Sequence, residues 1–129
     1  MKNNRLKNFL GPAFLIISLS TAQAVDMKNM EILKDFGEVK NGTCQGQAVP
    51  IGYRVLHYDF VESSATLKDA VSKMDLSYMS MLGMEYISKK TLNNYTVLTY
   101  KSSGYKNRYY TFSIKNIKTG TLICSVVYQ

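Results

Sequence analysis

The only histidine of the chain, His57, precedes Asp59 and Glu62 in the stretch HYDFVE. Residues two apart on a β-strand project to the same face, so Asp59 could orient the His57 imidazole as a general acid or base. Small secreted ribonucleases combine a histidine, a carboxylate and basic residues that hold phosphate, and all these residue types occur here. No nucleophile elbow, phosphate loop or paired-carboxylate motif accompanies them. A structural role for His57 is therefore the simpler interpretation.

Methionines are concentrated just before and within the stretch DLSYMSMLGMEY, and two more lie near residue 27. Thioethers bind Cu(I), so a copper-binding protein outside the cytoplasm is one alternative. Methionine also fills irregular gaps in apolar cores, and this is the interpretation we favour. We expect no metal or other cofactor. The methionines concerned are Met27, Met30, Met74, Met79, Met81 and Met84.

The stretch TYKSSGYKNRYYT, residues 99–111, holds four tyrosines, three cations and no acid. Residues 86–129 carry 7 cations and no acid, whereas residues 25–85 carry 6 cations and 9 acids. Cations attract phosphate or carboxylate groups, and tyrosines offer stacking faces and hydroxyl donors. We predict that this surface binds an anionic partner: a lipid headgroup, lipopolysaccharide, a cell-wall polymer or an acidic protein. The predicted contact residues are Lys101, Tyr105, Lys106, Arg108 and Tyr109.

Two other interpretations of the basic surface bear on this prediction. Lysines on exposed strands keep sheet edges from pairing with other chains, and they need no ligand to do so. Specific recognition of nucleic acid is not expected, because no recognisable binding motif is present. The oligomeric state is left open by the sequence.

The first 24 residues resemble a signal peptide. Lys2, Arg5 and Lys7 precede an apolar run at residues 9–19, and Ala22-Gln23-Ala24 supplies a small-x-small cleavage site. The apolar run is too short to span a bilayer, which needs about 20 residues. We expect cleavage after Ala24 and a bacterial protein that is periplasmic or secreted, with no transmembrane segment in residues 25–129. Removal of the three leader cations from the 16 leaves 13 against 9 acids, a net charge of about +4.

The mature part, residues 25–129, is long enough for a single globular α+β domain and too short for two. Its two cysteines, Cys44 and Cys124, have no metal-ligand spacing and no CxxC motif. In an oxidising compartment such a pair indicates one disulfide bond. Closing a loop of about 80 residues would stabilise the fold by about 4 kcal/mol in the chain-entropy model.

The hydrophobic periodicity predicts an α+β domain. It contains a short N-terminal helix over about 27–36 and an antiparallel sheet of about five strands, with one long amphipathic helix, about 67–82, packed on one face. Thr66 and Asp69 fit a capping box at the start of the long helix. In the strand 108–115, alternation places Tyr110, Phe112 and Ile114 inward and Thr111, Ser113 and Lys115 outward. The other expected strands are 52–61, 86–91, 95–102 and 121–128.

Together these features favour a small exported accessory or binding protein without catalytic activity. It would act through the basic, tyrosine-rich surface of the C-terminal sheet. Two alternatives stay open: a small secreted, nuclease-like hydrolase that uses His57, and a periplasmic Cu(I)-binding protein that uses the methionines.

Overall fold

The computed structural model describes residues 28–44, 49–74 and 76–129. The predicted signal peptide, residues 1–24, and Met27 lie outside the described residues. None of the helices in the described part is long and apolar enough to cross a membrane.

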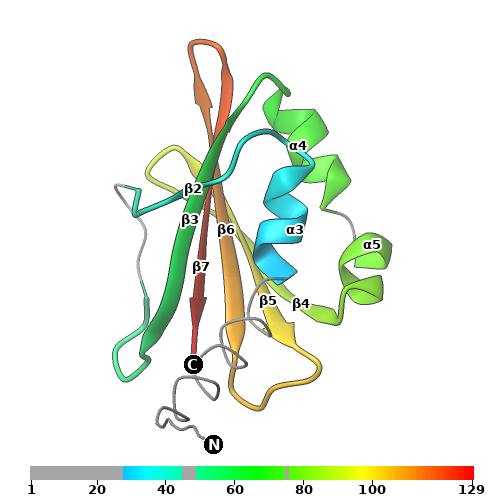
Figure 1. Cartoon of the computed structure of the whole chain (residues 1–129), viewed down its shortest axis with the longest axis vertical. Helices are drawn as coiled ribbons and strands as arrows, with labels where there is room; N and C mark the ends of the chain where they lie inside the picture. Colours follow the sequence, from blue (N-terminus) through cyan, green and yellow to red (C-terminus); the bar gives the residue numbers. More distant parts are fainter. Residues whose placement is uncertain (1–27, 45–48, 75) are drawn as a thin grey trace, which may run out of the picture.

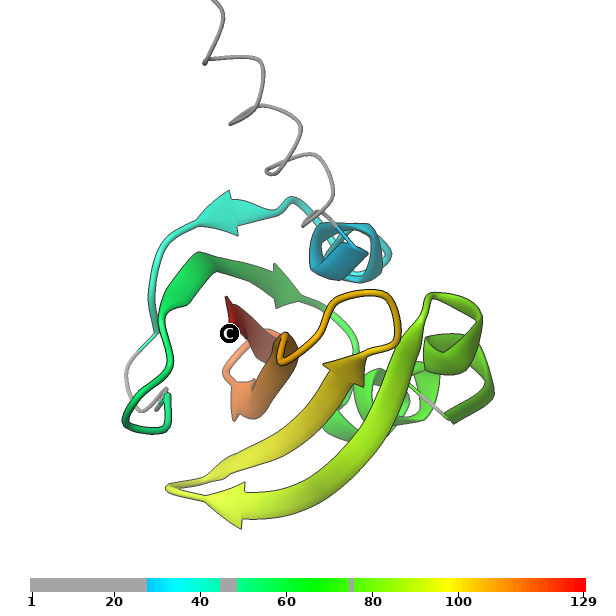
Figure 2. The same cartoon turned by 90° about the horizontal axis from the view of Figure 1, so that it is seen from below.

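The described residues form three short helices and a six-stranded antiparallel sheet (Figure 1). The strands lie side by side in the order β2-β3-β7-β6-β5-β4. The helices pack on one face of the sheet, which curves strongly around them (Figure 2). In chain order the elements are α3 (Lys28–Lys34), β2 (Lys40–Asn41), β3 (Val55–Ser63), α4 (Leu67–Lys73), α5 (Leu76–Met81), β4 (Met84–Leu92), β5 (Tyr95–Ser102), β6 (Tyr109–Ile117) and β7 (Gly120–Tyr128).

The core lies between the helices and the sheet. Alternating residues of β5, β6 and β7 point into it, so the predicted inward set Tyr110, Phe112 and Ile114 is buried. Ile32 and Leu33 of α3 lie against this layer together with residues from the other two helices. Burial of these apolar surfaces is the main force that holds helices this short on the sheet.

The prediction of one long helix over 67–82 is wrong. The segment contains two short helices, α4 and α5, although its apolar stripe does face the core. α4 begins as predicted, because the Thr66 side chain accepts a hydrogen bond from the Asp69 backbone N–H at 3.1 Å. It ends at Met74, whose N–H bonds to the carbonyl of Val71 rather than to the residue four positions earlier. The Tyr100 hydroxyl donates to the Met74 carbonyl at 2.8 Å, so a core tyrosine takes the acceptor that a continuous helix would use.

The expectation of about five strands is also corrected, because the sheet has six. The additional strand, β2, is two residues long and pairs with β3. β4 to β7 form the expected succession of neighbouring strands. β3 instead pairs with the last strand, β7, over nearly its whole length.

The face of the sheet opposite the helices, here called the helix-free face, is not uniformly exposed. Thr111 and Ser113 point to this face as the alternation predicts, yet they are buried. Three tyrosines and a connecting segment cover part of this face, as described below. A two-residue alternation identifies the faces of a strand but does not show which of them solvent reaches.

The predicted disulfide between Cys44 and Cys124 is confirmed, with the two Cα atoms 6.3 Å apart. Cys124 lies in β7 directly opposite Phe60 of β3. The bond therefore attaches the chain after β2 to the strand in the middle of the sheet. No free cysteine occurs among the described residues.

Candidate binding site

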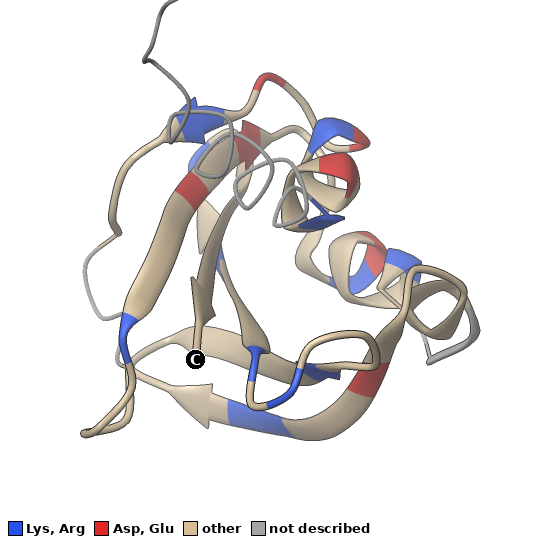
Figure 3. Cartoon of the chain, turned by 60° about the horizontal axis from the view of Figure 1, so that its bottom comes forward, with Lys and Arg blue, Asp and Glu red and all other residues tan. Residues whose placement is uncertain are grey.

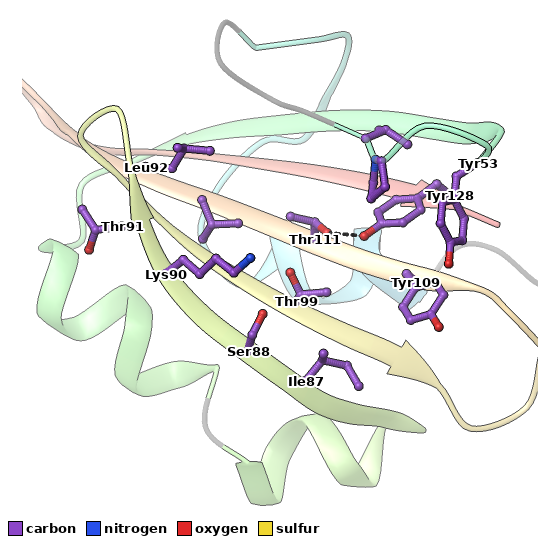
Figure 4. Close-up of a pocket in the computed structure, with 13 residues that line it drawn as sticks. Tyr53, Ile87, Ser88, Lys90, Thr91, Leu92, Thr99, Tyr109, Thr111 and Tyr128 are labelled. Atoms are coloured by element: carbon purple, nitrogen blue, oxygen red, sulfur yellow. Dashed lines mark hydrogen bonds between the residues drawn. The ribbon is translucent and has the colours of Figure 1, made fainter.

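A groove of about 560 Å³ crosses the helix-free face over β4, β5, β6 and β7 (Figure 4). Its floor comes from alternate residues of the central strands, one side from β4 and the other from the segment before β3. The lining residues are Val49, Pro50, Tyr53, Ile87, Ser88, Lys90, Thr91, Leu92, Val97, Thr99, Tyr109, Thr111 and Tyr128. The groove thus combines apolar side chains with hydroxyl groups and one cation.

Three tyrosines close one end of the groove. Tyr109 and Tyr128 are register partners on β6 and β7, and their rings stack with centroids 5.6 Å apart and an interplanar angle of 20°. Tyr53 meets both rings edge-on, at 5.6 Å from Tyr109 and 5.3 Å from Tyr128. Aromatic pairs in these geometries stabilise their own arrangement, so the three rings form a pre-organised surface.

The segment of residues 49–54, called the wall segment, is held to β7 by its own backbone. The N–H of Arg54 donates to the carbonyl of Gln129 at 2.8 Å, and the N–H of Gln129 donates back to the carbonyl of Arg54 at 3.0 Å. Upstream of the wall segment, the disulfide fixes Cys44 to the same strand. The side of the groove opposite β4 is therefore attached at two points.

Polar groups meet in the middle of the groove. The hydroxyl of Thr111 donates to that of Tyr128 at 3.3 Å. The ammonium of Lys90 extends along the groove toward Thr99 and Thr111 (Figure 4). No acidic side chain lines this groove in the described part of the chain. Lys90 thus gives the groove an uncompensated positive charge beside a row of hydroxyl groups.

The predicted anion-binding residues differ in their exposure to solvent. Tyr109 lines the groove, and its register partner Lys101 is partly buried on β5. Lys106 is exposed on the β5–β6 connection, where Tyr105 is partly buried. Arg108 was expected at the solvent side but is only 8% exposed.

Arg108 has structural contacts that account for its burial. Its Nε donates to Oε1 of Gln129 at 3.0 Å, and its guanidinium carbon lies 4.0 Å from the centroid of the Tyr105 ring. The guanidinium thus fastens the β5–β6 connection to the end of the chain.

Sequence reasoning missed the contributions of Tyr53, Lys90 and Tyr128 to this groove. The alternation along β7 could have placed Tyr128 on the helix-free face. Tyr53 had no comparable signal, because the wall segment is not a strand. The distribution of charge agrees with the sequence: acids occur mainly on the helices and β3, whereas β4 and the β5–β6 connection carry basic residues (Figure 3).

His57 belongs to a separate polar cluster on the helix side of β3. Its Nδ1 lies 2.7 Å from Oδ2 of Asp59, which confirms that the two side chains share a face. Asp59 is 1% exposed and also accepts hydrogen bonds from Asn29 at 3.1 Å and Asn41 at 3.3 Å. Asn29 donates as well to the hydroxyl of Ser125 at 2.8 Å. A buried carboxylate requires such donors, so the cluster has a structural role in joining α3 and β2 to β3.

The imidazole of His57 is partly exposed, with 23% of its side chain accessible. It borders a shallow hollow of about 470 Å³ lined mainly by residues 41–43 and 55–58. Ser125, the nearest hydroxyl in the cluster, is fully buried. The geometry therefore offers an oriented imidazole without an accessible serine nucleophile beside it.

The methionines do not gather at one surface. Met74, Met79 and Met84 are buried in the core, whereas Met81 is 83% exposed. Among the described residues, no group of three or more His, Cys, Asp or Glu side chains is placed to hold a metal ion.

Comparison of the chain with protein families, with curated proteins and with solved structures finds no match.

Proposed function

We propose that this protein is an exported, non-catalytic binding module whose helix-free sheet face receives an anionic partner. The single observation that carries the proposal is the groove of about 560 Å³, with Lys90 directed into it and no acid in its lining. The partner classes are those with exposed phosphate or carboxylate groups: lipid headgroups, lipopolysaccharide, cell-wall polymers and acidic proteins. The disulfide supports a location in an oxidising compartment, either periplasmic or outside the cell.

The chemistry of the groove suits binding of a ligand that is partly apolar and negatively charged. Tyr109 and Tyr128 supply ring faces and hydroxyl groups, while Ile87 and Leu92 supply apolar contacts at the β4 side. Lys90 is exposed, so it attracts an anion through water and this attraction weakens as salt rises. Because the rings already contact one another, little ordering entropy would oppose binding.

Replacement of Lys90 and Lys101 by glutamine tests the proposal. The double variant is expected to bind a responsive anionic probe about tenfold more weakly at low salt, which is about 1.4 kcal/mol of binding free energy. The probes are phosphatidylglycerol vesicles, lipopolysaccharide, lipoteichoic acid and poly-glutamate, and the measurement is equilibrium binding at increasing ionic strength. The wild type should lose affinity as salt rises, and the double variant should depend less on salt.

Lys118→Gln is a single-charge control for these substitutions. Lys118 is exposed in the turn between β6 and β7, outside the groove, and removing its charge lowers the net charge by one unit. Its binding should stay close to that of the wild type, and all variants should keep their unfolding free energy within about 1 kcal/mol. Equal affinities of the double variant and the wild type for every probe would contradict the proposal.

A second candidate function, a small hydrolase, is favoured by one observation. The His57 imidazole is oriented by a buried carboxylate 2.7 Å away, as a general base would be. The absence of an accessible nucleophile in the described cluster counts against it. The Cu(I) alternative has less support, since Met74, Met79 and Met84 are packed in the core.

His57→Ala separates the two functions. A binding module should keep its affinity within about threefold of the wild type, because His57 lies on the face of β3 opposite the groove. A hydrolase should lose about 10²–10⁴-fold in turnover, the usual contribution of a general acid or base. The measurement is cleavage of RNA, phosphodiester and ester substrates, with circular dichroism to establish that the variant is folded.

A further inference from the structure

β4 is the edge strand of the sheet on the side of the groove. No other strand in the described part of the chain pairs with its outer edge, and the opposite edge is the two-residue strand β2. β4 is nine residues long, and most of its side chains are exposed. Ile87 and Leu92, 48% and 47% exposed, lie on this strand and also line the groove. A long free edge offers a row of unpaired backbone donors and acceptors to another chain.

The turn after β4 determines which backbone groups face outward. Asn93 and Asn94 have φ angles of 50° and 70°, which is the conformation of a two-residue type I′ hairpin turn. In such a turn the flanking residues, Leu92 and Tyr95, form a hydrogen-bonded pair. Hydrogen-bonded and non-hydrogen-bonded pairs then alternate along the two strands.

By this alternation Thr91 and Lys89 belong to non-hydrogen-bonded pairs with β5. Their N–H and C=O groups therefore point away from β5, toward the free edge. Residues two apart share a face, so Ser88, Lys90 and Leu92 project toward the groove. A strand added at this edge would bond to the backbone of Lys89 and Thr91 and place alternate side chains beside the opening of the groove.

The charges on the edge select the kind of strand that fits. Lys89 and Lys90 project to opposite faces of β4, so both sides of an added strand would lie beside a cation. A second copy paired antiparallel and centred on Lys89 or Lys90 would set like charges opposite each other, and a register centred on Ser88 would leave both lysines without an opposite charge. An added strand with Asp or Glu at the facing positions would instead form favourable cross-strand pairs.

We propose that the β4 edge binds an extended acidic segment of a partner protein as a seventh strand, with alternate side chains beside the opening of the groove. The proposal rests on the proposed function and commits it to one partner class, an acidic protein segment. Backbone hydrogen bonds to Lys89 and Thr91 provide the docking, Lys89 and Lys90 select acidic residues, and apolar side chains of the segment cover Ile87 and Leu92.

Selection from a displayed library of random nine-residue peptides, the length of β4, tests the proposal on the disulfide-bonded protein. The selected peptides are expected to be enriched in Asp and Glu. These acidic residues should alternate with β-branched or aromatic residues, and the affinity of the peptides should fall as salt rises. A selection that returns no binder, or binders without acidic enrichment, overturns the proposal. Binding of phosphatidylglycerol vesicles that depends on Lys90, in the absence of any peptide binder, also overturns it but leaves the proposed function intact.

Two N-methylated versions of the best peptide examine the pairing itself without altering the protein. The two versions are methylated on complementary sets of alternate amides. Alternate N–H groups of a strand point to opposite sides, so only one version blocks the donors that face β4. One version should bind more than about tenfold more weakly, and the other within about twofold of the parent peptide. Equal effects of the two versions overturn edge pairing.

Substitutions on the protein side give an independent check. Thr91→Pro removes an outward N–H and should weaken peptide binding by about tenfold, whereas Lys118→Gln, outside β4 and the groove, should leave binding close to that of the wild type. Lys89→Pro serves as a second variant if Thr91→Pro does not fold. Unchanged peptide affinity in a folded proline variant contradicts the proposal. If a Lys90→Gln variant binds every anionic probe as tightly as the wild type does, that result instead contradicts the proposed function.

Discussion

Gly120→Ala is expected to destabilise the fold by about 2 to 6 kcal/mol, the combined size of backbone strain and overpacking. Gly120 begins β7, directly after the turn that joins it to β6, and has a φ angle of 149°. A Cβ at this position would overlap the backbone oxygen of Ser63 and lie 2.8 Å from the Cα of Ser64. Both obstacles are backbone atoms, so the connection between β3 and α4 would have to move.

Gly104→Ala is the control for this substitution. Gly104 lies in the connection between β5 and β6, and a Cβ there meets no atom within 4 Å. Its unfolding free energy, measured by urea denaturation, should change by less than about 1 kcal/mol. Similar unfolding midpoints for Gly120→Ala and the wild type would show that the close approach to Ser63 is not a constraint on the fold.

Removal of the disulfide is expected to lower the unfolding free energy by about 4 kcal/mol. The bond joins residues separated by 80 positions, so it removes many conformations from the unfolded chain. Cys44→Ala combined with Cys124→Ala avoids a free thiol that could form bonds between molecules. Urea denaturation of the oxidised wild type and the double variant gives the difference from the midpoints and slopes.

The reduced wild-type protein is the control, because it keeps both sulfur atoms and changes only the bond. It should lose about as much stability as the double variant. If the double variant loses more unfolding free energy than the reduced wild type, the difference measures how much packing of the fully buried Cys124 side chain stabilises the fold. A loss below about 1 kcal/mol in both would mean that the cross-link does not constrain the unfolded state.

The strands of the C-terminal half could be predicted because each has a local pattern. Tyr110, Phe112 and Ile114 alternate with polar residues, and their burial follows directly from that alternation. The break in the predicted long helix lies beside a non-local contact: the carbonyl of Met74, just after α4, accepts a hydrogen bond from the hydroxyl of Tyr100, 26 residues away. The sheet also wraps its helices in a curve, and no local periodicity encodes that curvature.

The candidate site was predictable only where it consists of strand residues. Tyr109, one of the predicted contact residues, lies on a strand and lines the groove. Lys90 and Tyr53 were missed because the groove forms where β4 and the wall segment approach from distant parts of the chain. Arg108 looked like a surface cation, yet Gln129 and the ring of Tyr105 hold it in the interior. Composition identified the basic region but not which of its cations are available to a ligand.

The pairing of β3 with β7 has a consequence for the order of folding. Residues 55–63 find their neighbouring strand only at residues 120–128, at the far end of the chain. The entropy of closing so long a loop must be overcome before these contacts form, which slows folding. Until β7 has been synthesised, β2 and β3 lack the strand on which they assemble. Pairing of β3 with β7 and formation of the Cys44–Cys124 bond therefore belong to a late step of folding, whereas β4, β5 and β6 can pair with one another before it.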